Sequence, residues 1–359
     1  MKGLILSGGA GTRLRPITHT SAKQLVPVAN KPILYFGIED MVEAGITEIG
    51  IITGETGPEI RAAVGDGSQF GAKVTYIPQD APLGLAHCVL IAKDFLGDDD
   101  FVMYLGDNLL RQGIAEFVQQ FEADATSAQR AAAQILLARV PDPQRFGVAV
   151  IGESGDVEEL VEKPENPKSD LALVGVYLFD KTIHTAVRAI EPSPRGELEI
   201  TDAIQWLIDN GHRVRHEILD GWWKDTGKLE PLLEGNRLVL EMLETSIEGS
   251  VDASTKMSGI VVVEPGATVR NSTLEGPCIV GRNSVIENSH IGPFTSIYFE
   301  CEISDSTITN SIVLEESSIT NVRSLTGSLI GKEVKVTGVD EESHHLMVGD
   351  HSVIVISQR

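Results

Sequence analysis

Cysteine is scarce in this sequence, and it contains no long apolar run. Cys88, Cys278 and Cys301 are the only cysteines, and none has CxxC spacing, so the sequence supports neither a disulfide framework nor a zinc knuckle. We expect three buried thiols in a reducing cytosol. No apolar run approaches the roughly 18 residues of a membrane-spanning helix, and Met1-Lys2 leads directly into an apolar segment. We therefore expect a soluble, cytoplasmic protein with no membrane partner.

Positive charge is also in short supply. The chain has 29 Lys and Arg against 52 Asp and Glu, a net charge of −23, which argues against a nucleic-acid partner because such partners select basic surfaces. Any local group of cations is then a feature suited to a small anionic ligand. At 359 residues the chain exceeds the usual size of one hydrophobic core, which predicts two domains.

The stretch from Gly3 to Pro32 contains the strongest chemical signal. Its apolar start, Leu4-Ile5-Leu6, breaks at once into Ser7-Gly8-Gly9-Ala10-Gly11. A glycine turn can bring its backbone close to a ligand, and successive free N–H groups there attract anions. We expect this turn to bind phosphate.

Two well-known phosphate loops do not match this turn. Leu14 stands where a dinucleotide fingerprint needs its third glycine, and Thr12-Arg13 stand where a Walker loop needs Gly-Lys. What remains is a glycine turn flanked by Arg13 and, ten residues on, Lys23. A planar guanidinium and a mobile ammonium beside N–H groups suit a polyphosphate. The alternative is an ordinary strand-to-helix turn with solvated cations.

Apolar periodicity then alternates between strand and helix. We expect strands at 48–53, 73–78, 101–105, 131–140, 148–151, 158–161 and 174–179, and helices at 33–43, 58–65, 83–95, 113–122, 183–190, 203–210 and 229–243. Asp202 and Gln205 have the spacing of a capping box for the helix at 203–210. The alternation predicts an α/β fold, a mostly parallel sheet with helices on both faces, whose ligands bind beyond the carboxyl ends of the strands.

Two of the expected loops carry candidate ligand-binding side chains. Gln79 follows one strand, and its amide can pair with the edge of a pyrimidine, while Gly84 allows a base to approach the backbone. Asp107 follows the strand at 101–105, a position that suits Mg²⁺. An aspartate there can equally cap a following helix.

The period changes after a boundary near residues 244–249. Apolar residues recur every six positions from Val251 and again from Ile279, with small or polar residues between them. This pattern predicts a parallel β-solenoid. The rhythm slips near Leu274 and after Ile303, where we expect loops or imperfect turns; a β-sandwich is the alternative. Stacked repeats of this kind often pack against partner chains.

The segments GGAGTRLRPIT and AKQLVPVANKPI resemble the signature of the sugar-1-phosphate nucleotidylyltransferases, in the form of the branch that uses dTTP and glucose 1-phosphate. The resemblance runs to about Arg237, and the rest resembles the hexapeptide-repeat tail of long members. It implies a Rossmann-like catalytic domain at residues 1–243 and a left-handed parallel β-helix at residues 244–359. It also implies Mg²⁺ as cofactor, and a homo-oligomer formed through either domain would fit.

The resemblance assigns roles residue by residue. It makes Arg13, Lys23 and Lys163 catalytic. It places the nucleotide on Leu6, Gly8, Gly9, Gly11, Thr12, Arg13, Lys23, Gln79 and Gly84. It places the sugar phosphate on Asn108, Gly147, Glu162, Lys163, Val174 and Arg195, and the metal on Asp107 and Asp225. One departure is Phe146, which stands where near relatives carry tyrosine.

The residues themselves suggest a reaction between two phosphates. A sugar 1-phosphate is mostly dianionic at neutral pH, since its second pKa lies near ~6, so it needs no general base. Catalysis would then come from positioning and charge neutralisation. The same residues leave UTP or another hexose phosphate open, because Gln79 cannot distinguish thymine from uracil.

Two further alternatives concern the chain as a whole. The solenoid could acetylate an amino sugar with a histidine base, and its candidates are His290, His344, His345 and His351. Few cations accompany those histidines to hold coenzyme A. A non-catalytic binder of nucleotide sugars would be favoured if Arg13, Lys23, Asp107 or Asp225 were missing, and all four are present.

Overall fold

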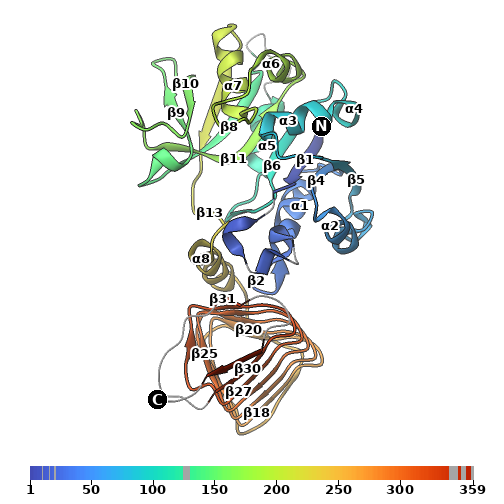
Figure 1. The fold of residues 1–359 in the computed structure, drawn as a ribbon, viewed down its shortest axis with the longest axis vertical. Coiled ribbons are helices and arrows are strands. Elements are labelled where there is room, and N and C mark those ends of the chain that lie inside the picture. Colours follow the sequence, from blue (N-terminus) through green and yellow to red (C-terminus); the bar gives the residue numbers. More distant parts are fainter. Residues whose placement is uncertain are drawn as a thin grey trace. The chain divides into compact units, whose positions relative to one another are not determined.

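A computed structural model of the chain describes residues 1–9, 11–15, 17–19, 22–123, 130–338, 347–348 and 353–356. The chain forms two compact units. The first consists of Met1–Ala10 and Leu34–Trp223, and the second of Gly11–Ile33 and Lys224–Arg359. Figure 1 shows the helices and strands of each unit. Within the described residues, no helix has both the length and the apolarity needed to cross a membrane.

A nine-stranded sheet forms the centre of the first unit. Its strands are β1 (Lys2–Ser7), β4 (Glu48–Thr53), β5 (Lys73–Pro78), β6 (Phe101–Leu105), β8 (Ala133–Arg139), β9 (Gly147–Ile151), β10 (Val157–Glu162), β11 (Leu171–Phe179) and β12 (Val214–Ile218). The short strands β7 (Asn108–Leu110) and β13 (Trp223–Asp225) follow β6 and β12 in the sequence.

The main path through this sheet runs β10-β9-β11-β6-β1-β4-β5, and β8 joins β11 to β12. The pairs β6·β1, β1·β4 and β4·β5 are parallel, whereas β11 is antiparallel to both β6 and β8. The carboxyl ends of β1, β4, β5 and β6 therefore meet at one edge of the sheet. The sheet is mixed rather than uniformly parallel, and the expected α/β fold is confirmed.

Helices cover both faces of the sheet, as the alternation of strand side chains requires. The helices are α1 (Ile33–Glu43), α2 (Gly57–Val64), α3 (Leu85–Ile91), α4 (Lys93–Leu96), α5 (Ala115–Ala123), α6 (Ile183–Ala189) and α7 (Ile200–Asp209), with the short 3-10 helices η4 (Ser68–Phe70) and η5 (Pro143–Arg145). Tyr104 faces α1, where its hydroxyl donates to Asp40 at 3.0 Å. Its neighbour Met103 points the other way, into a buried cluster with residues of α3, α4, α6 and α7.

Three details differ from the expected elements. The helix expected at 83–95 is two helices, α3 and α4, that meet at Ala92. The expected capping box is wrong, because α7 begins at Ile200, which places Asp202 inside its first turn. Gln205 instead accepts a hydrogen bond from the backbone N–H of Leu160 at 2.7 Å, so the side chain ties α7 to β10.

The second unit joins an N-terminal segment to the C-terminal half of the chain. Its N-terminal segment contains η1 (Thr12–Leu14), η2 (Ile17–His19), η3 (Lys23–Leu25) and the hairpin strands β2 (Pro27–Val28) and β3 (Lys31–Pro32). Helix α8 (Leu229–Leu240) precedes the coiled strands. Leu232 and Leu240 of α8 are fully buried, which accounts for the leucine-rich pattern of this helix.

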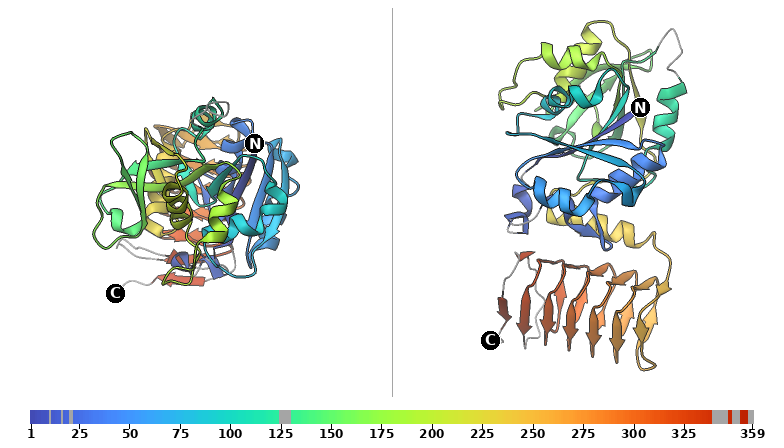
Figure 2. Two further views of the ribbon diagram at one scale, coloured as in Figure 1. Left: turned by 90° about the horizontal axis from the view of Figure 1, so that it is seen from above. Right: turned by 90° about the vertical axis from the view of Figure 1, so that its right-hand side faces the viewer.

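The C-terminal strands wind into stacked coils whose three walls are parallel sheets, and Figure 2 shows the coils side by side. One wall contains β14 (Ser246–Ile247), β17 (Val261–Val263), β20 (Cys278–Val280), β23 (Thr295–Ile297), β26 (Ile312–Val313), β29 (Leu329–Ile330) and β31 (Met347–Val348). The second contains β15 (Ser250–Val251), β18 (Thr268–Arg270), β21 (Val285–Glu287), β24 (Glu302–Ser304), β27 (Ser318–Thr320), β30 (Lys335–Gly338) and β32 (Val353–Ile356). The third contains β16 (Lys256–Ser258), β19 (Thr273–Glu275), β22 (His290–Ile291), β25 (Thr307–Thr309) and β28 (Leu325–Thr326). The expected β-helix is confirmed.

The length of one coil explains why the six-residue rhythm slips. Val263 pairs with Val280, and Val269 pairs with Ile286, an offset of 17 residues in each case. Three hexapeptides would need 18 residues, so the apolar phase must shift by one residue in each turn. The core accordingly contains Ile286 rather than the expected Val285. The expectation of interrupting loops is wrong, since the slip is a regular property of the coil.

Candidate functional site

The loops after β1, β4 and β5 converge at one edge of the sheet. Gly8 lies so close to the other two loops that a Cβ atom on it would stand 2.8 Å from Oε1 of Gln79 and 3.7 Å from the backbone nitrogen of Gly54. Because β1, β4 and β5 are parallel neighbours, their following loops must meet there. The structure therefore brings the predicted glycine turn and the predicted base-reading amide together.

Helix α3 holds the side chain of Gln79 in place. Its Nε2 lies 3.1 Å from Nδ1 of His87 and donates to Sγ of Cys88 at 3.3 Å. Burial raises the pKa of Cys88 to about 12, so this thiol stays protonated and neutral. With Nε2 engaged by α3, Oε1 is the end of the amide that faces Gly8. A carbonyl oxygen can accept the N3–H of thymine or uracil, whereas cytosine has no hydrogen on that atom.

Gly84 has a structural reason to be glycine. Its φ is +103°, and a Cβ there would lie 2.4 Å from the carbonyl oxygen of Leu198. The backbones of the two segments are also bonded, since Leu198 donates to Leu83 at 2.8 Å and Ala86 donates to Leu198 at 3.0 Å. Packing against the segment before α7 therefore requires glycine whether or not a base binds here.

Asp107 lies beside the end of β1. Gly106 donates its N–H to the carbonyl of Leu6 at 3.0 Å, and a Cβ on Gly106 would meet Oγ of Ser7 at 2.6 Å. The element after Asp107 is the strand β7 rather than a helix, so the helix-capping alternative is wrong.

Ser7 is a residue that the sequence reasoning missed. It is fully buried, and its hydroxyl has no hydrogen-bond partner among the described residues. It stands between the glycine turn and Gly106-Asp107. The sequence signal would have been a lone polar residue at the end of an otherwise apolar strand.

Arg13 and Asp225 meet in the second unit. A Cβ on Gly227 would lie 2.8 Å from Nη2 of Arg13 and 3.0 Å from Oδ1 of Asp225. The carboxylate of Asp225 also accepts the N–H of Gly227 at 3.0 Å. The predicted polyphosphate-binding guanidinium and a predicted metal ligand, 212 positions apart in the sequence, therefore line the same glycine.

Lys23 is brought close to the glycine turn by a compact fold of the same segment. Gly11 has a left-handed φ of +60°, and a Cβ on it would stand 2.9 Å from Cβ of Lys23. Thr18 closes the turn by donating its hydroxyl to the carbonyl of Gly11 at 2.7 Å. Gly11, Arg13 and Lys23 thus share one small region of the second unit.

The predicted sugar-phosphate residues converge in the first unit. Nδ2 of Asn108 donates to the carbonyl of Val174 at 2.6 Å, and Oδ1 accepts Nε1–H of Trp223 at 3.1 Å. Gly147 pairs with Glu162 across β9 and β10. Strand β11, which carries Val174, pairs with β9. These contacts link β7, β9, β10 and β11 at one place.

Two cations sit at the end of this group, paired with carboxylates. Nζ of Lys163 lies 3.0 Å from Glu162, and Nη2 of Arg195 lies 2.8 Å from Glu199 and 3.4 Å from Glu162. Burial by itself would lower the pKa of Arg195, but the hydrogen bond and charge of Glu199, with the charges of Glu197 and Glu162, raise it. A phosphate entering here would compete with these carboxylates for the same donors.

A nearby carboxyl group, Asp202, was assigned only a capping role from the sequence. Its pKa is raised, chiefly because burial disfavours the charged form and also because of the charges of Glu199 and Glu162. The region therefore gathers several acids around its two cations. That arrangement suits hydroxyl groups of a sugar next to an anionic group, because carboxylates accept hydrogen bonds from hydroxyls.

Lys163 has a strained backbone, with φ at +42°. A left-handed conformation costs a non-glycine residue roughly 1–2 kcal/mol, and such strain concentrates at functional sites. Phe146 packs on the neighbouring Trp223, with ring centroids 5.4 Å apart. The departure from tyrosine thus leaves the aromatic contact in place and removes a hydroxyl.

Metal binding depends on the two predicted aspartates. Among the described residues, no group of three or more His, Cys, Asp or Glu side chains is arranged as a metal cage. Mg²⁺ needs no such cage, since it usually takes one or two carboxylates and completes its octahedron with water and substrate phosphate. The carboxylates of Asp107, at the end of β6, and Asp225, beside Arg13, are donors of this kind.

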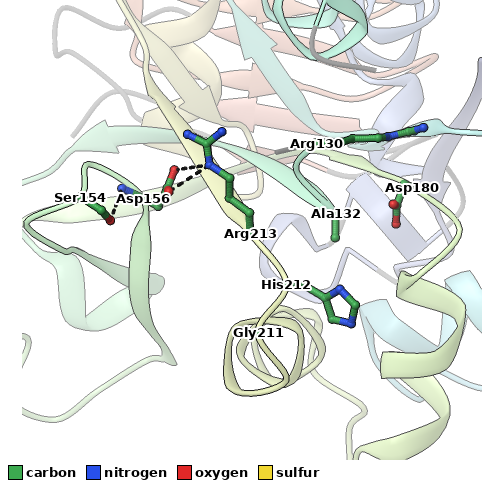
Figure 3. A pocket seen from close by; sticks show the side chains of 8 residues that line it. All are labelled: Arg130, Ala132, Ser154, Asp156, Asp180, Gly211, His212 and Arg213. Carbon is green, nitrogen blue, oxygen red and sulfur yellow. Dashed lines mark hydrogen bonds and ion pairs between the residues drawn. The ribbon is translucent and has the colours of Figure 1, made fainter. Parts of the chain in front are cut away.

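A separate polar pocket of about 560 Å³ lies at the other edge of the sheet. Figure 3 shows the guanidinium of Arg213 facing the carboxylate of Asp156, with Nε 3.0 Å from each oxygen. The lining residues are Arg130, Ala132, Ser154, Asp156, Asp180, Gly211, His212 and Arg213. Strands β8 and β12 begin there and β11 ends there, opposite the edge that carries Asp107. None of the predicted site residues lines this pocket.

The acetylation alternative gains no support from the described residues. His290 on β22 pairs through Nε2 with Glu275 at 3.2 Å. His344, His345 and His351 lie outside the described residues. Of the predicted nucleotide-binding residues, the side chain of Thr12 also lies outside the description.

Comparisons with known proteins agree in kind. The family model described as nucleotidyl transferase matches residues 2–242. The chain is 56% identical to the glucose-1-phosphate thymidylyltransferase of Streptomyces griseus, over 99% of this chain and 100% of the relative. It is also 56% identical to the protein of the same name from Streptomyces antibioticus, over 99% of each chain. Among solved structures, it is similar to a Bacillus anthracis protein described as a glucose-1-phosphate thymidylyltransferase in complex with sucrose. That match has a TM-score of 0.61 and 39% identity, and it covers 66% of this chain and 94% of the other.

Proposed function

The chain belongs to the nucleotidyl transferase family, and we propose that it transfers a deoxythymidylyl group from dTTP to α-D-glucose 1-phosphate, giving dTDP-glucose and pyrophosphate. The choice of substrates rests on the Streptomyces relatives of that name, which match over their full length. The structural observation that carries the proposal is the meeting of Arg13 and Asp225 at Gly227. This places a phosphate-binding cation beside a metal-binding carboxylate.

The two substrates would be bound by different groups of residues. The glycine turn of Gly8, Gly9 and Gly11, with Thr12 and Arg13, would hold the β- and γ-phosphates of dTTP, and Leu6 would line the same turn. Oε1 of Gln79 would accept the N3–H of the base, with Gly84 beneath it. Lys163 and Arg195 would hold the phosphate of the sugar, exchanging some of their carboxylate contacts for phosphate oxygens.

The remaining predicted residues would contact the sugar itself. Glu162 accepts hydrogen bonds from sugar hydroxyls in this proposal, and the backbones of Gly147 and Val174 offer further polar groups. Asn108, whose amide is held between Val174 and Trp223, would fix the edge of this pocket. Its role would be to position the sugar rather than to move a proton.

The chemical step is a direct displacement. An oxygen of the sugar phosphate attacks the α-phosphorus of dTTP and forms a new P–O bond. The bond between the α-phosphorus and the bridging oxygen breaks, and pyrophosphate leaves with that electron pair. The attacking oxygen is already ionised, so no general base is needed. Lys23 would neutralise charge on the α-phosphoryl group during transfer, because catalysis of phosphoryl transfer is mainly positioning and electrostatic stabilisation.

Asp107 and Asp225 would hold the magnesium ion. Bound there, Mg²⁺ supplies Lewis-acid stabilisation of phosphate charge and brings the oxygens of the two substrates together. The N–H of Gly227 orients the Asp225 carboxylate. An oriented carboxylate loses less freedom when it binds an ion, which favours binding.

We assign residues 1–243 to the catalytic domain and residues 244–359 to the β-helix domain. The substrates are small anions, and the net charge of −23 makes nucleic acid an unfavourable partner. We propose a cytoplasmic enzyme with no membrane partner. Self-association through the β-helix or the catalytic domain remains part of the proposal, since stacked coils expose flat surfaces.

Pyrophosphate release by the purified protein tests the proposal. The assay takes dTTP, UTP and dCTP against glucose 1-phosphate and N-acetylglucosamine 1-phosphate, each with Mg²⁺. We expect the highest kcat/KM with dTTP and glucose 1-phosphate, and rejection of dCTP, since Gln79 presents a carbonyl oxygen to the base. Preference for UTP or for the amino sugar would contradict the substrate assignment. Absence of turnover with every pair would contradict the enzyme assignment.

A further inference from the structure

Asn236 of α8 ties three parts of the second unit together. Its Oδ1 accepts the backbone N–H of Ala29 at 2.8 Å and the hydroxyl of Ser296 at 2.7 Å. Its Nδ2 donates to the carbonyl of Phe294 at 3.1 Å. Asn236 is fully buried, so each of these groups would be left without water if the amide were removed.

A second contact joins the same partners independently. Nδ2 of Asn30 donates to the carbonyl of Ile297, in strand β23, at 2.8 Å. Ala29 and Asn30 form the two-residue turn of the β2–β3 hairpin, with φ values of +46° and +60°. Such values are typical of a type I′ turn. The tip of the hairpin is therefore fastened to a coil of the β-helix at two successive residues.

The hairpin follows directly on the segment that carries Lys23. Helix η3 ends at Leu25, and Val26 donates to the carbonyl of Lys23 at 3.3 Å and accepts the N–H of Ile33 at 3.2 Å. We call residues 22–33 the Lys23 segment. Its only regular structure is one 3-10 turn and a hairpin of two-residue strands, which is too little to hold its position alone. The β-helix coil is a stacked, hydrogen-bonded support.

We infer that Asn236 and the coil at residues 294–297 position the Lys23 segment for nucleotidyl transfer, so that the β-helix is a working part of the catalytic site. Asn236 is a positioning residue, since it acts through the hairpin and not on a substrate. An amide suits this role because it accepts from two donors and donates to a carbonyl at once. The inference rests on the proposed function for its kinetic readout, but not for its structural one.

Two variants of the full-length protein, each with a matched control, test the inference. Asn236→Ala removes the hub, and Ser317→Ala is its control, because Ser317 is equally buried and bonds to Gly331 at 2.8 Å within the β-helix. Asn30→Gly keeps the left-handed turn and removes only the contact with Ile297. Its control is Asn310→Gly, which makes the same change at a left-handed asparagine of the β-helix with φ of +43°.

We expect a split between the kinetic constants of the two substrates. Displacing Lys23 by about 1 Å should lower kcat/KM for dTTP about a hundredfold in Asn236→Ala, and about tenfold in Asn30→Gly. The KM for glucose 1-phosphate should stay unchanged, because the sugar-phosphate residues lie in the other unit. Both controls should match the wild type. Wild-type kinetics in a folded Asn30→Gly protein would overturn the inference, and this variant decides the matter if Asn236→Ala does not fold.

Hydrogen exchange provides a readout that does not need catalysis. Amides of residues 22–33 should exchange at least about tenfold faster in Asn236→Ala and Asn30→Gly than in their controls, because their support is lost. Unchanged protection of this segment would overturn the inference even for an inactive wild-type protein. Inactivity of the wild type with normal support of the segment would count against the proposed reaction alone.

Discussion

Replacing Gly227 by alanine is the sharpest test of the pairing of Arg13 with Asp225. The new methyl group would stand 2.8 Å from Nη2 of Arg13, whereas ordinary contacts begin at 3.4 Å, so the guanidinium must retreat by about 0.6 Å. The same methyl group would lie 3.0 Å from Oδ1 of Asp225. A displacement of about 1 Å in a positioning group can cost a hundredfold in rate. We therefore expect kcat/KM to fall by roughly tenfold to a hundredfold, or about 1.4–2.7 kcal/mol of barrier.

The stability of the protein should hardly change in the same variant. Arg13 is exposed and can move its far end, and Gly227 does not have a left-handed backbone. A compatible glycine-to-alanine change stabilises by about 0.4–1 kcal/mol through the unfolded chain, which offsets part of the crowding. We expect the free energy of unfolding to stay within about 1 kcal/mol of the wild type, as measured by urea denaturation.

A matched control separates local crowding from catalysis. Gly152, in the turn between β9 and β10, also lacks a left-handed backbone. A Cβ there would meet Oε2 of Glu158 at 3.0 Å, a similar encounter away from the predicted site. Gly152→Ala should release pyrophosphate at the wild-type rate. A folded Gly227→Ala protein with wild-type kcat/KM, or equal impairment of the two variants, would refute the reasoning.

Four further predictions use other parts of the site. Chelation of divalent ions should abolish pyrophosphate release and added Mg²⁺ should restore it, while Asp225→Asn should raise the Mg²⁺ concentration for half-maximal activity at least about tenfold, since a carboxylate ligand is lost; an unchanged Mg²⁺ requirement would argue against this ligand. Lys163→Gly should unfold at higher urea than Lys163→Ala by about 1 kcal/mol, because glycine relieves the left-handed strain at φ +42°, although both variants should lose activity; equal stability would mean that the strain is not present. Ser7→Ala should stabilise the protein by about 1 kcal/mol, since the buried hydroxyl has no partner among the described residues, and should lower kcat/KM because that hydroxyl adjoins the glycine turn; a less stable Ser7→Ala protein would reveal a partner in the fold. Burial raises the pKa of each of the three cysteines to about 12, so a thiol reagent at pH 8 should label none of them quickly in the native protein and all of them in urea; fast native labelling would contradict their burial.

Local periodicity in the sequence was enough to predict most elements of the first unit. The strand at 101–105 and the helix at 33–43 have the bounds of β6 and α1, because continuous apolar runs and helical spacing are properties of neighbouring residues. The helix expected at 83–95 failed at its middle, where the chain turns at Ala92. The expected cap at Asp202 failed because packing against β10 sets where α7 begins.

The length of a β-helix coil shows a limit of another kind. A six-residue period was readable, but the phase of the core was not, since 17 residues per coil force a one-residue shift that mimics an irregularity. Only the pairing of successive coils reveals which residue of each strand points inward. Val285 was therefore assigned to the core in place of Ile286.

The sequence by itself determined which residues could do the chemistry, because a glycine turn with Arg13, Lys23 and two aspartates is a set of residue types suited to phosphates and Mg²⁺. Tertiary structure decided which of them meet. Arg13 reaches Asp225 only through Gly227, and Ala29 reaches the β-helix only through Asn236. Such contacts join residues more than 200 positions apart, and no local pattern records them, since they form only when distant elements pack together and exclude water.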